Sequence, residues 1–356
     1  MSSEDGGRGQ RKLFFLLSGE HPTLPHAEAK AILEAEGFGF RVVEELDQLL
    51  RLACDPACSE PVASRASMTR ACCLELFTCP AGEEEILEMA LEAPLHEHVR
   101  PGQSLRVRVK RIKAYGRGLD ILKLERELGA IILKAAEGLK VDLKRPDADF
   151  LGVITEERFF FGLKLSEARR PGFSRRRPSR RPFFHPSAMM PKLARCMVNL
   201  SRARRGELVL DPFCGTGSIL IEAALIGCSA LGLDISSRMA FGALLNARFV
   251  KTEPAGVLVA DALEAPLRPS SIDRVVTDPP YGRSASTTGL DIRTLYERFL
   301  HALPELLPRG KMACVAAPSW LGLPEMASEA GLKPIEAFSI FIHSGLAREL
   351  VVLQTL

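Results

Sequence analysis

Hydrophobic and polar positions follow a different order in the two halves of the 356-residue chain. In the second half, short apolar runs alternate with segments of helical periodicity, which predicts a doubly wound α/β sheet. Five runs are expected to be parallel strands: 208–213, 230–236, 256–262, 273–280 and 312–318. Two further runs, 335–343 and 349–356, are separated by only five residues. Such a short connection cannot hold a crossover helix, so we expect this last pair to be antiparallel.

The first half has a less regular pattern, which predicts a smaller α+β region. Helical periodicity is clear in 26–37 and 83–93, and strand candidates lie around these segments, beginning with the apolar run 13–19. Residues 1–12 are rich in glycine, serine and charge, and we expect this tail to be disordered. Residues 167–186 carry many arginines and four prolines, a composition that predicts a stiff, polar linker between two domains.

One strand candidate of the first half, RVRVKRIK at 106–113, alternates basic and apolar residues. As a strand it would present Arg106, Arg108 and Lys110 on one face and turn Val107 and Val109 inward. A basic stripe of this kind suits a nucleic-acid backbone, where phosphate contacts dominate affinity. The alternative is a solvated edge strand whose charges prevent aggregation.

Composition excludes few classes of protein, but it indicates the cellular location and the growth temperature of the source organism. Hydrophobic residues make up 46% of the chain and charged residues 26%, a usual balance for a soluble globular protein, and the net charge is only +3. No apolar run approaches the roughly 20 residues of a membrane span, and the run 13–19 is too short for a signal peptide. The sequence therefore favours a cytoplasmic location. Only two asparagines and four glutamines occur, which indicates a thermophilic source.

Nine cysteines are present, and Cys54, Cys58, Cys72, Cys73 and Cys79 are close enough in sequence to raise the question of zinc. Their spacing does not match the usual pairs of closely spaced cysteines of a zinc site. Buried thiols, or one disulfide as occurs inside hyperthermophiles, are the favoured interpretation. No metal is expected.

The first strand of the second half leads into DPFCGTGSILIEA, residues 211–223. Gly215 and Gly217 allow a tight turn and close approach of a ligand to the backbone, before a helix whose N-terminus attracts negative groups. Two glycines alone are weak evidence, but Asp211 ends the strand at the edge where open α/β sheets bind ligands. Phe213 lies inside this turn.

Two more acids end the next two strands. Asp234 is placed to accept hydrogen bonds from the ribose hydroxyls of a nucleoside, with Ile235 beside it. Asp261 is placed to accept from the amino group of an adenine, with Ala262 packing against the ring. The alternative is that each aspartate caps the helix that follows it. A dinucleotide cofactor is disfavoured because the first turn is not GxGxxG.

The fourth strand ends in Asp278-Pro279-Pro280-Tyr281, which resembles the signature of methyltransferases that act on exocyclic amino nitrogens. The lone pair of such a nitrogen is delocalised into its ring, so the nitrogen is a poor nucleophile. The Asp278 carboxylate and the Pro279 carbonyl, which proline leaves outside a regular element, would hold the two N–H groups. Tyr281 would stack on a base that has left its helix, and transfer then depends on positioning and charge placement.

A wider resemblance covers most of residues 60–356. Segments 180–202, 210–223 and 277–282 are similar to the archaeal tRNA guanine-10 N2-methyltransferases, and 106–118, 140–154 and 159–171 resemble their THUMP domain. The resemblance implies S-adenosylmethionine as donor, tRNA as partner held by the THUMP region, and one or two methyl transfers to N2 of a guanine. The implied organisation is a tail (1–12), an α+β region containing the THUMP domain (13–166), a basic linker (167–186) and a class I methyltransferase domain (187–356).

The candidate residues follow from these motifs. The catalytic candidates are Asp278, Pro279, Pro280 and Tyr281. The cofactor candidates are Asp211, Phe213, Gly215, Gly217, Asp234, Ile235, Asp261, Ala262 and His185. The RNA-binding candidates are Arg106, Arg108, Lys110, Arg111, Lys113, Arg175, Arg176 and Arg177.

Several assignments stay open. His185 either contacts the cofactor or packs its own loop, and Arg283 either meets a phosphate or is a surface residue. His343 and Arg348 are either structural or RNA-contacting, while Tyr296 and Phe299 are expected in the core. Other functions remain possible: methylation of a guanine elsewhere in tRNA or in rRNA, or tRNA binding without catalysis. The sequence leaves the nucleotide position, the number of methyl groups, the oligomeric state and any need for an activator open, and no obligatory protein partner is predicted.

Overall fold

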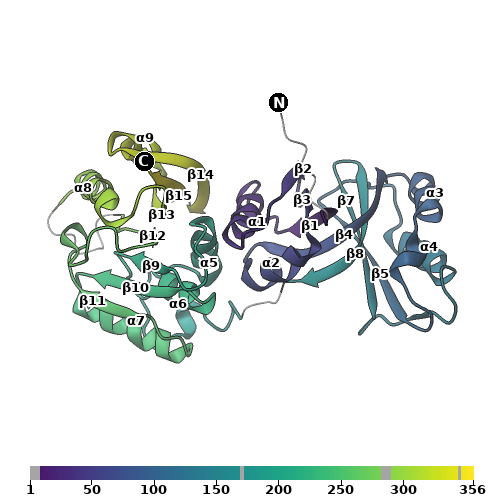
Figure 1. Cartoon of the computed structure of the whole chain (residues 1–356), viewed down its shortest axis with the longest axis horizontal. Helices are drawn as coiled ribbons and strands as arrows, with labels where there is room; N and C mark the ends of the chain where they lie inside the picture. The colour runs from purple at the N-terminus through teal and green to yellow at the C-terminus, as the bar shows by residue number, and fades with distance from the viewer. Residues whose placement is uncertain (1–8, 169–171, 282–289, 344–345) are drawn as a thin grey trace. The chain divides into compact units, whose positions relative to one another are not determined.

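The computed structural model describes residues 9–168, 172–281, 290–343 and 346–356, with side-chain detail omitted for 342, 343 and 346. The chain forms two compact units (Figure 1). The first consists of Met1–Ser64 and Met68–Arg169, and the second of Arg65–Ser67 and Arg170–Leu356. Each unit has its own sheet. No helix in the described part of the chain is long and apolar enough to cross a membrane.

The first unit is built on an eight-stranded sheet in the order β2-β3-β1-β4-β8-β7-β5-β6. Its elements are β1 (Arg11–Leu17), α1 (Leu24–Ala35), β2 (Arg41–Leu46), β3 (Leu49–Cys54), η1 (Pro56–Cys58), α2 (Ser59–Arg65), β4 (Thr69–Pro80), α3 (Glu83–Glu92), η2 (Leu95–His98), β5 (Ser104–Arg111), α4 (Ile121–Leu133), β6 (Lys140–Val141), β7 (Ala148–Thr155) and β8 (Arg158–Glu167). In the described part of this sheet, β5 is parallel to both of its neighbours, β6 and β7, and the other strand pairs are antiparallel.

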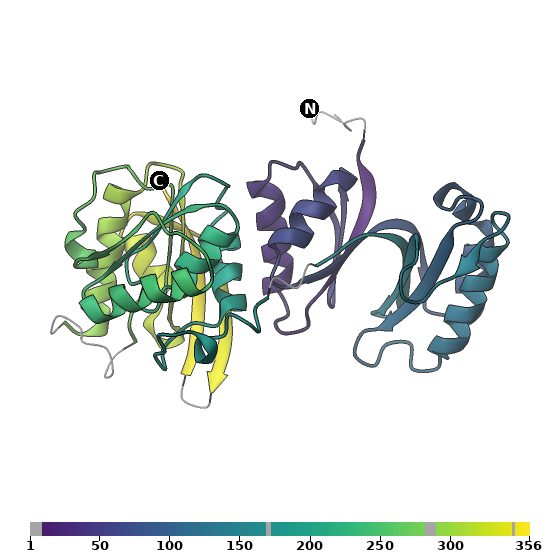
Figure 2. The same ribbon diagram turned by 90° about the horizontal axis from the view of Figure 1, so that it is seen from below.

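Helical and strand periods explain how the first unit packs. Leu124, Leu128 and Ile132 recur every fourth residue on α4, and all three side chains are buried in one hydrophobic cluster with residues of the sheet. Figure 2 shows the helix α4 lying along the sheet beside β5. In β5, Val107 and Val109 are buried while Arg108 between them is exposed. The alternation predicted for this strand is therefore confirmed.

The second unit contains a seven-stranded sheet in the order β11-β10-β9-β12-β13-β15-β14. Its elements are η3 (Pro178–Arg180), α5 (Pro191–Leu200), β9 (Leu208–Asp211), α6 (Ser218–Leu225), β10 (Ser229–Asp234), α7 (Ser237–Phe249), β11 (Gly256–Val259), η4 (Ala262–Glu264), β12 (Arg274–Thr277), α8 (Ile292–Leu306), β13 (Met312–Pro318), η5 (Ser319–Leu321), α9 (Leu323–Glu329), β14 (Leu332–His343) and β15 (Leu346–Thr355). The first five strands are parallel, and β15 is antiparallel to both β13 and β14. The predicted α/β class is confirmed.

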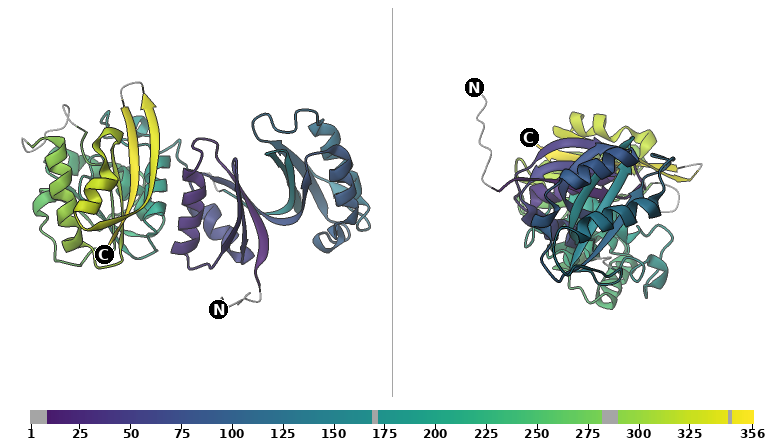
Figure 3. Two further views of the ribbon diagram at one scale, coloured as in Figure 1. Left: turned by 90° about the horizontal axis from the view of Figure 1, so that it is seen from above. Right: turned by 90° about the vertical axis from the view of Figure 1, so that its right-hand side faces the viewer.

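Helices cover both faces of this sheet, with α6 and α7 on one side and α8 and α9 on the other (Figure 1). The central strands are buried on both faces, which explains why β13 is almost continuously apolar in sequence and why the two middle residues of β12 are valines. Tyr296, Phe299 and Leu303 of α8 pack into the same core. The hairpin of β14 and β15 is longer than the parallel strands and extends past them (Figure 3).

The predicted linker is in part a packed element of the second unit. Arg176 and Arg181 are 8% and 5% exposed, and Pro178 of η3 between them is buried. The guanidinium of Arg176 pairs with Glu222, which is itself fully buried on α6. These positions of a segment with polar composition are therefore buried, because a buried carboxylate far away in sequence supplies a partner for the charge of Arg176.

All nine cysteines are buried free thiols. Cys54 and Cys58 are hydrogen-bonded to each other, and this contact and burial raise the pKa of the Cys54 thiol. Burial likewise raises the pKa of Cys73 and Cys314. Among the described residues, no group of three or more histidine, cysteine or acidic side chains is arranged to hold a metal ion. Of the two interpretations favoured for the cysteines, the structure has buried thiols.

Candidate functional site

The loop after β9 is held in a conformation that only glycine adopts easily. Gly215 and Gly217 have φ angles of +51° and +78°. A side chain at Gly217 would also be obstructed, because its Cβ would lie 3.0 Å from the Cβ of Ala243 on α7. The loop therefore closes tightly over the N-terminus of α6, where free backbone N–H groups point outward from the carboxyl edge of the sheet.

Asp234, the last residue of β10, fixes this loop. Its Oδ2 accepts a hydrogen bond from the backbone N–H of Gly215 at 2.9 Å, and its Oδ1 accepts from Ser236 N–H at 2.8 Å. Burial raises the pKa of the carboxyl, although both N–H groups favour its charged form. Ile235 beside it is 48% exposed, an apolar side chain left at the surface next to the acid. The Asp234 carboxylate suits the sugar hydroxyls of a nucleoside, and the exposed Ile235 side chain suits one face of its base.

Asp261 has the capping role that was the alternative for the three acids. It is the N-cap of η4, and its Oδ1 accepts from Leu263 N–H at 2.9 Å. Ala262, the first residue of η4, is 5% exposed, and its predicted contact with an adenine ring stays a prediction. A contact from Asp261 to an adenine amino group remains a prediction.

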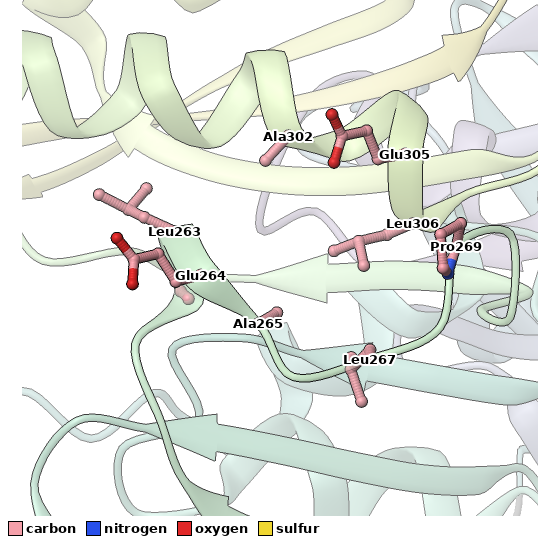
Figure 4. Close-up of a pocket in the computed structure, with 9 residues that line it drawn as sticks. Leu263, Glu264, Ala265, Leu267, Pro269, Ala302, Glu305 and Leu306 are labelled. Atoms are coloured by element: carbon pink, nitrogen blue, oxygen red, sulfur yellow. The ribbon is translucent and has the colours of Figure 1, made fainter.

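A small pocket lies between η4 and α8 (Figure 4). It is lined by Ala262, Leu263, Glu264, Ala265, Leu267, Pro269, Ala302, Glu305 and Leu306. Its volume of about 120 Å³ is well below the few hundred Å³ of a typical ligand pocket, and it lies on the side of η4 that faces α8. This pocket is therefore not where a nucleoside would bind.

Asp211 lies deeper than the other acids of the edge. It is 1% exposed, and its Oδ1 accepts from Thr277 Oγ1 at 2.7 Å and from Phe213 N–H at 3.3 Å. The pKa of Asp211 is raised to about 8: burial is the largest cause, the nearby carboxylates of Asp278 and Asp234 add to it, and the two hydrogen bonds partly offset it. Three acids thus crowd one edge, so the site favours a ligand that carries positive charge.

The fourth strand brings Asp278 together with Tyr281 and with Arg348 from β15. Asp278 Oδ1 accepts from the Tyr281 hydroxyl, and Oδ2 lies 3.1 Å from Arg348 Nη2. The guanidinium carbon of Arg348 lies 5.2 Å from the centre of the Tyr281 ring. Burial raises the pKa of Asp278, while the Arg348 charge and the Tyr281 hydroxyl lower it. We call Asp278, the Pro279 carbonyl and Tyr281 the amino-group clamp.

The Pro279 carbonyl is less free than expected. The Tyr296 hydroxyl lies 3.4 Å from it and 3.1 Å from the Ala316 carbonyl, which is the better acceptor of the two. A carbonyl has two lone pairs, so one remains available at Pro279. Tyr296 and Phe299 are almost completely buried, which confirms their place in the core, and Phe213 meets Phe299 edge-on at 5.3 Å.

Asn246 on α7 is a site residue that the sequence did not reveal. Its Oδ1 accepts from Phe183 N–H at 3.0 Å, and its Nδ2 donates to the carbonyls of Phe183 at 3.0 Å and Thr216 at 2.9 Å. This fully buried amide ties the segment that carries His185 to the glycine loop. His185 itself lies 2.7 Å from Ser187 Oγ, a local contact of the loop-packing kind.

The predicted RNA-binding residues differ in how available they are. Arg106 forms two hydrogen bonds to Asp149, Arg111 donates to the Leu119 carbonyl, and Lys110 is half-buried with a lowered pKa caused by burial. Arg108 and Lys113 are more exposed and pair at the surface with Glu125 and Asp47. Arg175 and Arg177 are exposed. Arg176 does not fit the prediction, because Glu222 holds it inside the second unit.

Three further residues with open assignments, Arg348, Arg283 and His343, have different outcomes. Arg348 pairs with Asp278 of the clamp, which is a structural contact at the site, and a contact from Arg348 to RNA stays a prediction. Arg283 lies outside the described residues, as does the side chain of His343. The structure therefore adds Arg348, Thr277 and Asn246 to the residues found from sequence.

The sheet order with its antiparallel last hairpin, the glycine loop and the acids at the carboxyl edge define a class I S-adenosylmethionine-dependent methyltransferase. Residues 178–348 match the family model described as RMKL-like, methyltransferase domain, and residues 80–164 match the THUMP domain. The chain belongs to the tRNA (guanine(10)-N2)-dimethyltransferase family, as the following relatives show.

The protein of that name from Methanothermobacter thermautotrophicus is 37% identical over 96% of this chain and 99% of its own length. The one from Methanocaldococcus jannaschii is 32% identical over 95% and 98%. Among solved structures, TrmN from Thermus thermophilus matches with a TM-score of 0.53 and 22% identity over 97% of this chain and all of its own. The putative methyltransferase SMU.472, solved with SAH, has a TM-score of 0.54 and 13% identity over 98% and 99%. These structures support the fold.

Proposed function

We propose that this protein transfers methyl groups from S-adenosylmethionine to the exocyclic N2 of a guanine in tRNA, at position 10, and that a second transfer to the same nitrogen follows. The observation that carries the proposal is the amino-group clamp, in which a buried carboxylate, a carbonyl and an aromatic ring meet at the carboxyl edge of the sheet. The names of the relatives above support guanine 10 as the target.

The residues of the edge fit S-adenosylmethionine. The first turn of α6, directly after the tight glycine loop, presents backbone N–H groups for its carboxylate, and Asp234 and Ile235 suit its ribose and adenine. The carboxyl groups of Asp211, Asp234 and Asp278 suit a sulfonium and an ammonium group, because a nearby positive charge favours their ionised form. Phe213, Asp261, Ala262 and His185 complete the proposed set. When bound, the cofactor supplies a methyl group activated by the positive charge on its sulfur.

The clamp supplies orientation and a proton acceptor. Asp278 and the Pro279 carbonyl hold the two N–H groups of the amine, which draws the lone pair of the nitrogen out of conjugation and toward the incoming methyl group. The Tyr281 ring supports the base from one face. The nitrogen loses one proton for each methyl group that it gains. Asp278 is placed to accept it, since burial favours its protonated form.

The two units divide the work in this proposal. Residues 13–166, which include the THUMP match, hold the tRNA, and residues 187–356 carry out the transfer, with 167–186 joining them. Phosphate contacts come from exposed basic side chains, of which Arg108, Lys113, Arg175 and Arg177 are the best placed. A tRNA substrate supports a cytoplasmic location, which is part of this proposal.

The test uses unmodified tRNA transcripts and a donor with a labelled methyl group. We expect label in N2-methylguanosine and N2,N2-dimethylguanosine at position 10, and none when inosine, which lacks the 2-amino group, replaces that guanosine. Asp278→Ala should abolish transfer and still bind S-adenosylhomocysteine. Label at another nucleoside, or retained activity in Asp278→Ala, would overturn the proposed target or the proposed role of the clamp.

A further inference from the structure

The amino-group clamp is occupied in this structure by a side chain of the protein itself. Arg348 places Nη2 3.1 Å from Asp278 Oδ2 and its guanidinium carbon 5.2 Å from the centre of the Tyr281 ring. The side chains of Arg348 and Asp278 are only 13% and 16% exposed, so the pair is screened from water. One guanidinium therefore contacts both the carboxylate and the aromatic ring that the target amine is proposed to contact.

The chemistry of this contact is that of the proposed substrate. The guanidinium of arginine is a planar carbon bonded to three nitrogens, with N–H donors along its edges. C2 of guanine is also bonded to three nitrogens, and N1–H and the 2-amino group present donors along one edge. Each can donate to a carboxylate while its plane lies near an aromatic ring. Arg348 is thus a chemical likeness of the base within the chain.

The fold explains why a residue near the C-terminus reaches this edge. β15 is antiparallel to β13, and Arg348 is paired with Pro318, the last residue of β13. The beginning of an antiparallel strand lies where its parallel neighbours end, so Arg348 comes to the carboxyl edge beside Asp278.

We propose that Arg348 is a placeholder in the amino-group clamp: it holds Asp278 and Tyr281 in position, and the target guanine displaces it when tRNA binds. This inference rests on the proposed function. Arg348 acts through Asp278, so it is a positioning residue. Substrate can bind only to molecules in which Arg348 has left the clamp. The apparent affinity for every substrate is therefore the intrinsic affinity multiplied by the fraction of molecules with an open clamp.

The first test removes the guanidinium and returns it as a small molecule. Arg348→Ala should lower the KM for tRNA roughly tenfold, the equivalent of one hydrogen bond to a charged group, with kcat changed less than about twofold. Ethylguanidinium should raise the KM of the variant again as a competitor of tRNA, and ethylammonium, which lacks the planar donor edge, should not. Arg248→Ala, at an exposed position on α7, is the matched control.

The outcomes separate this inference from the proposed function. A higher KM, or a large loss of kcat, in Arg348→Ala would mean that Arg348 binds the substrate, and the placeholder role would be wrong. A direct readout needs no activity: ethylguanidinium should raise the Tm of Arg348→Ala and leave that of Arg348→Ala/Asp278→Ala unchanged. If this holds but tRNA is not methylated, the proposed function alone fails. If Arg348→Ala does not fold, Arg348→Met keeps the bulk and should show the same fall in KM.

The pH profile supplies a second readout that a purely structural role would not move. Four titratable or charged groups lie near Asp278 and interact with it electrostatically. They are Arg348 of β15, Tyr281 of the same loop, Tyr296 of α8 and Asp211 of β9. Loss of the Arg348 charge raises the pKa of Asp278, so the acid limb of kcat/KM, which reports the free enzyme, moves to higher pH. The acid limb of kcat should stay in place, because Arg348 has already left the clamp in the substrate complex. KM values are therefore compared at a pH above the acid limbs of both kcat/KM and kcat. A shift of both limbs in Arg348→Ala would contradict the displacement of Arg348 by the substrate.

Discussion

Thr277 donates its hydroxyl hydrogen to Asp211 between the ends of β12 and β9, with 2.7 Å from Oγ1 to Oδ1. Both side chains are almost completely buried. Because Thr277 directly precedes Asp278, this bond connects the acid of the proposed cofactor edge to the strand end that carries the clamp. The two halves of the site therefore share one hydrogen bond.

Thr277→Val should weaken cofactor binding while keeping the shape of the side chain. The change leaves Asp211 buried with one hydrogen bond fewer, which raises the pKa of its carboxyl further above about 8. A bound cation favours the ionised form of Asp211, and a higher pKa makes that ionisation cost more, so we expect the affinity for S-adenosylmethionine to fall roughly tenfold near neutral pH. Titration calorimetry measures this. Thr252→Val, at a buried threonine bonded to the Ala247 carbonyl, is the control and should leave the affinity unchanged.

Asp211→Asn should stabilise the protein at alkaline pH and abolish its affinity for the cofactor. The pKa of Asp211 is raised from 3.8 to about 8, so the folded protein binds more protons than the unfolded chain between these values. The free energy of unfolding therefore falls as pH rises through this window. Asparagine keeps an oxygen that accepts from Thr277 and Phe213 but cannot ionise. We expect a Tm roughly 3 to 10 °C above wild type at about pH 9 and a smaller difference at about pH 5. A difference that does not vary with pH would contradict the raised pKa.

The elements of the second unit could be predicted because local patterns define them. Short apolar runs bounded by turn residues mark parallel strands, and an acid or glycine after each run marks the carboxyl edge. Arg348 was also visible, but only as a residue near the last turn. Its role depends on β15 running antiparallel beside β13, which brings its first residues to that same edge. Sequence order alone could suggest this placement but not that its side chain meets Asp278.

The residues whose roles could not be predicted from the sequence make contacts with segments that are distant in sequence. Asn246 and Phe183 are 63 positions apart, and Arg176 and Glu222 are 46 apart. Arg176 belongs to a run of basic residues in which its neighbours are exposed, so composition predicts solvent for all of them. A buried glutamate on α6 decides otherwise, and nothing in the pattern of α6 marks Glu222 as the partner.

Asn246→Ala should loosen the glycine loop. The substitution leaves buried polar groups of Phe183 and Thr216 without their partner, a cost of about 3 kcal/mol. We expect a Tm roughly 5 to 10 °C lower and an affinity for S-adenosylhomocysteine reduced by at least about fivefold. Asn199→Ala is the matched control, since Asn199 is equally buried but donates to the Arg65 carbonyl, also in the second unit. It should lower the Tm and leave the affinity for the ligand unchanged. Equal loss of affinity in both variants would assign the effect to general destabilisation.

Three consecutive arginines should respond in two different ways. Arg175 and Arg177 are exposed, so Arg175→Ala/Arg177→Ala should leave the Tm within about 2 °C and weaken tRNA binding, with the dependence of log Kd on log salt reduced by about 2. Arg176 lies between them with Nε 2.8 Å from Glu222 Oε1. Arg176→Ala should lower stability by about 3 kcal/mol, because the buried carboxylate loses one of the two arginine partners that it has among the described residues, and should leave the salt dependence unchanged. Thermal unfolding and tRNA binding at several salt concentrations measure both effects. If Arg176→Ala reduced the salt dependence as well, Arg176 would contact phosphate, and its assignment as a packed residue would be wrong.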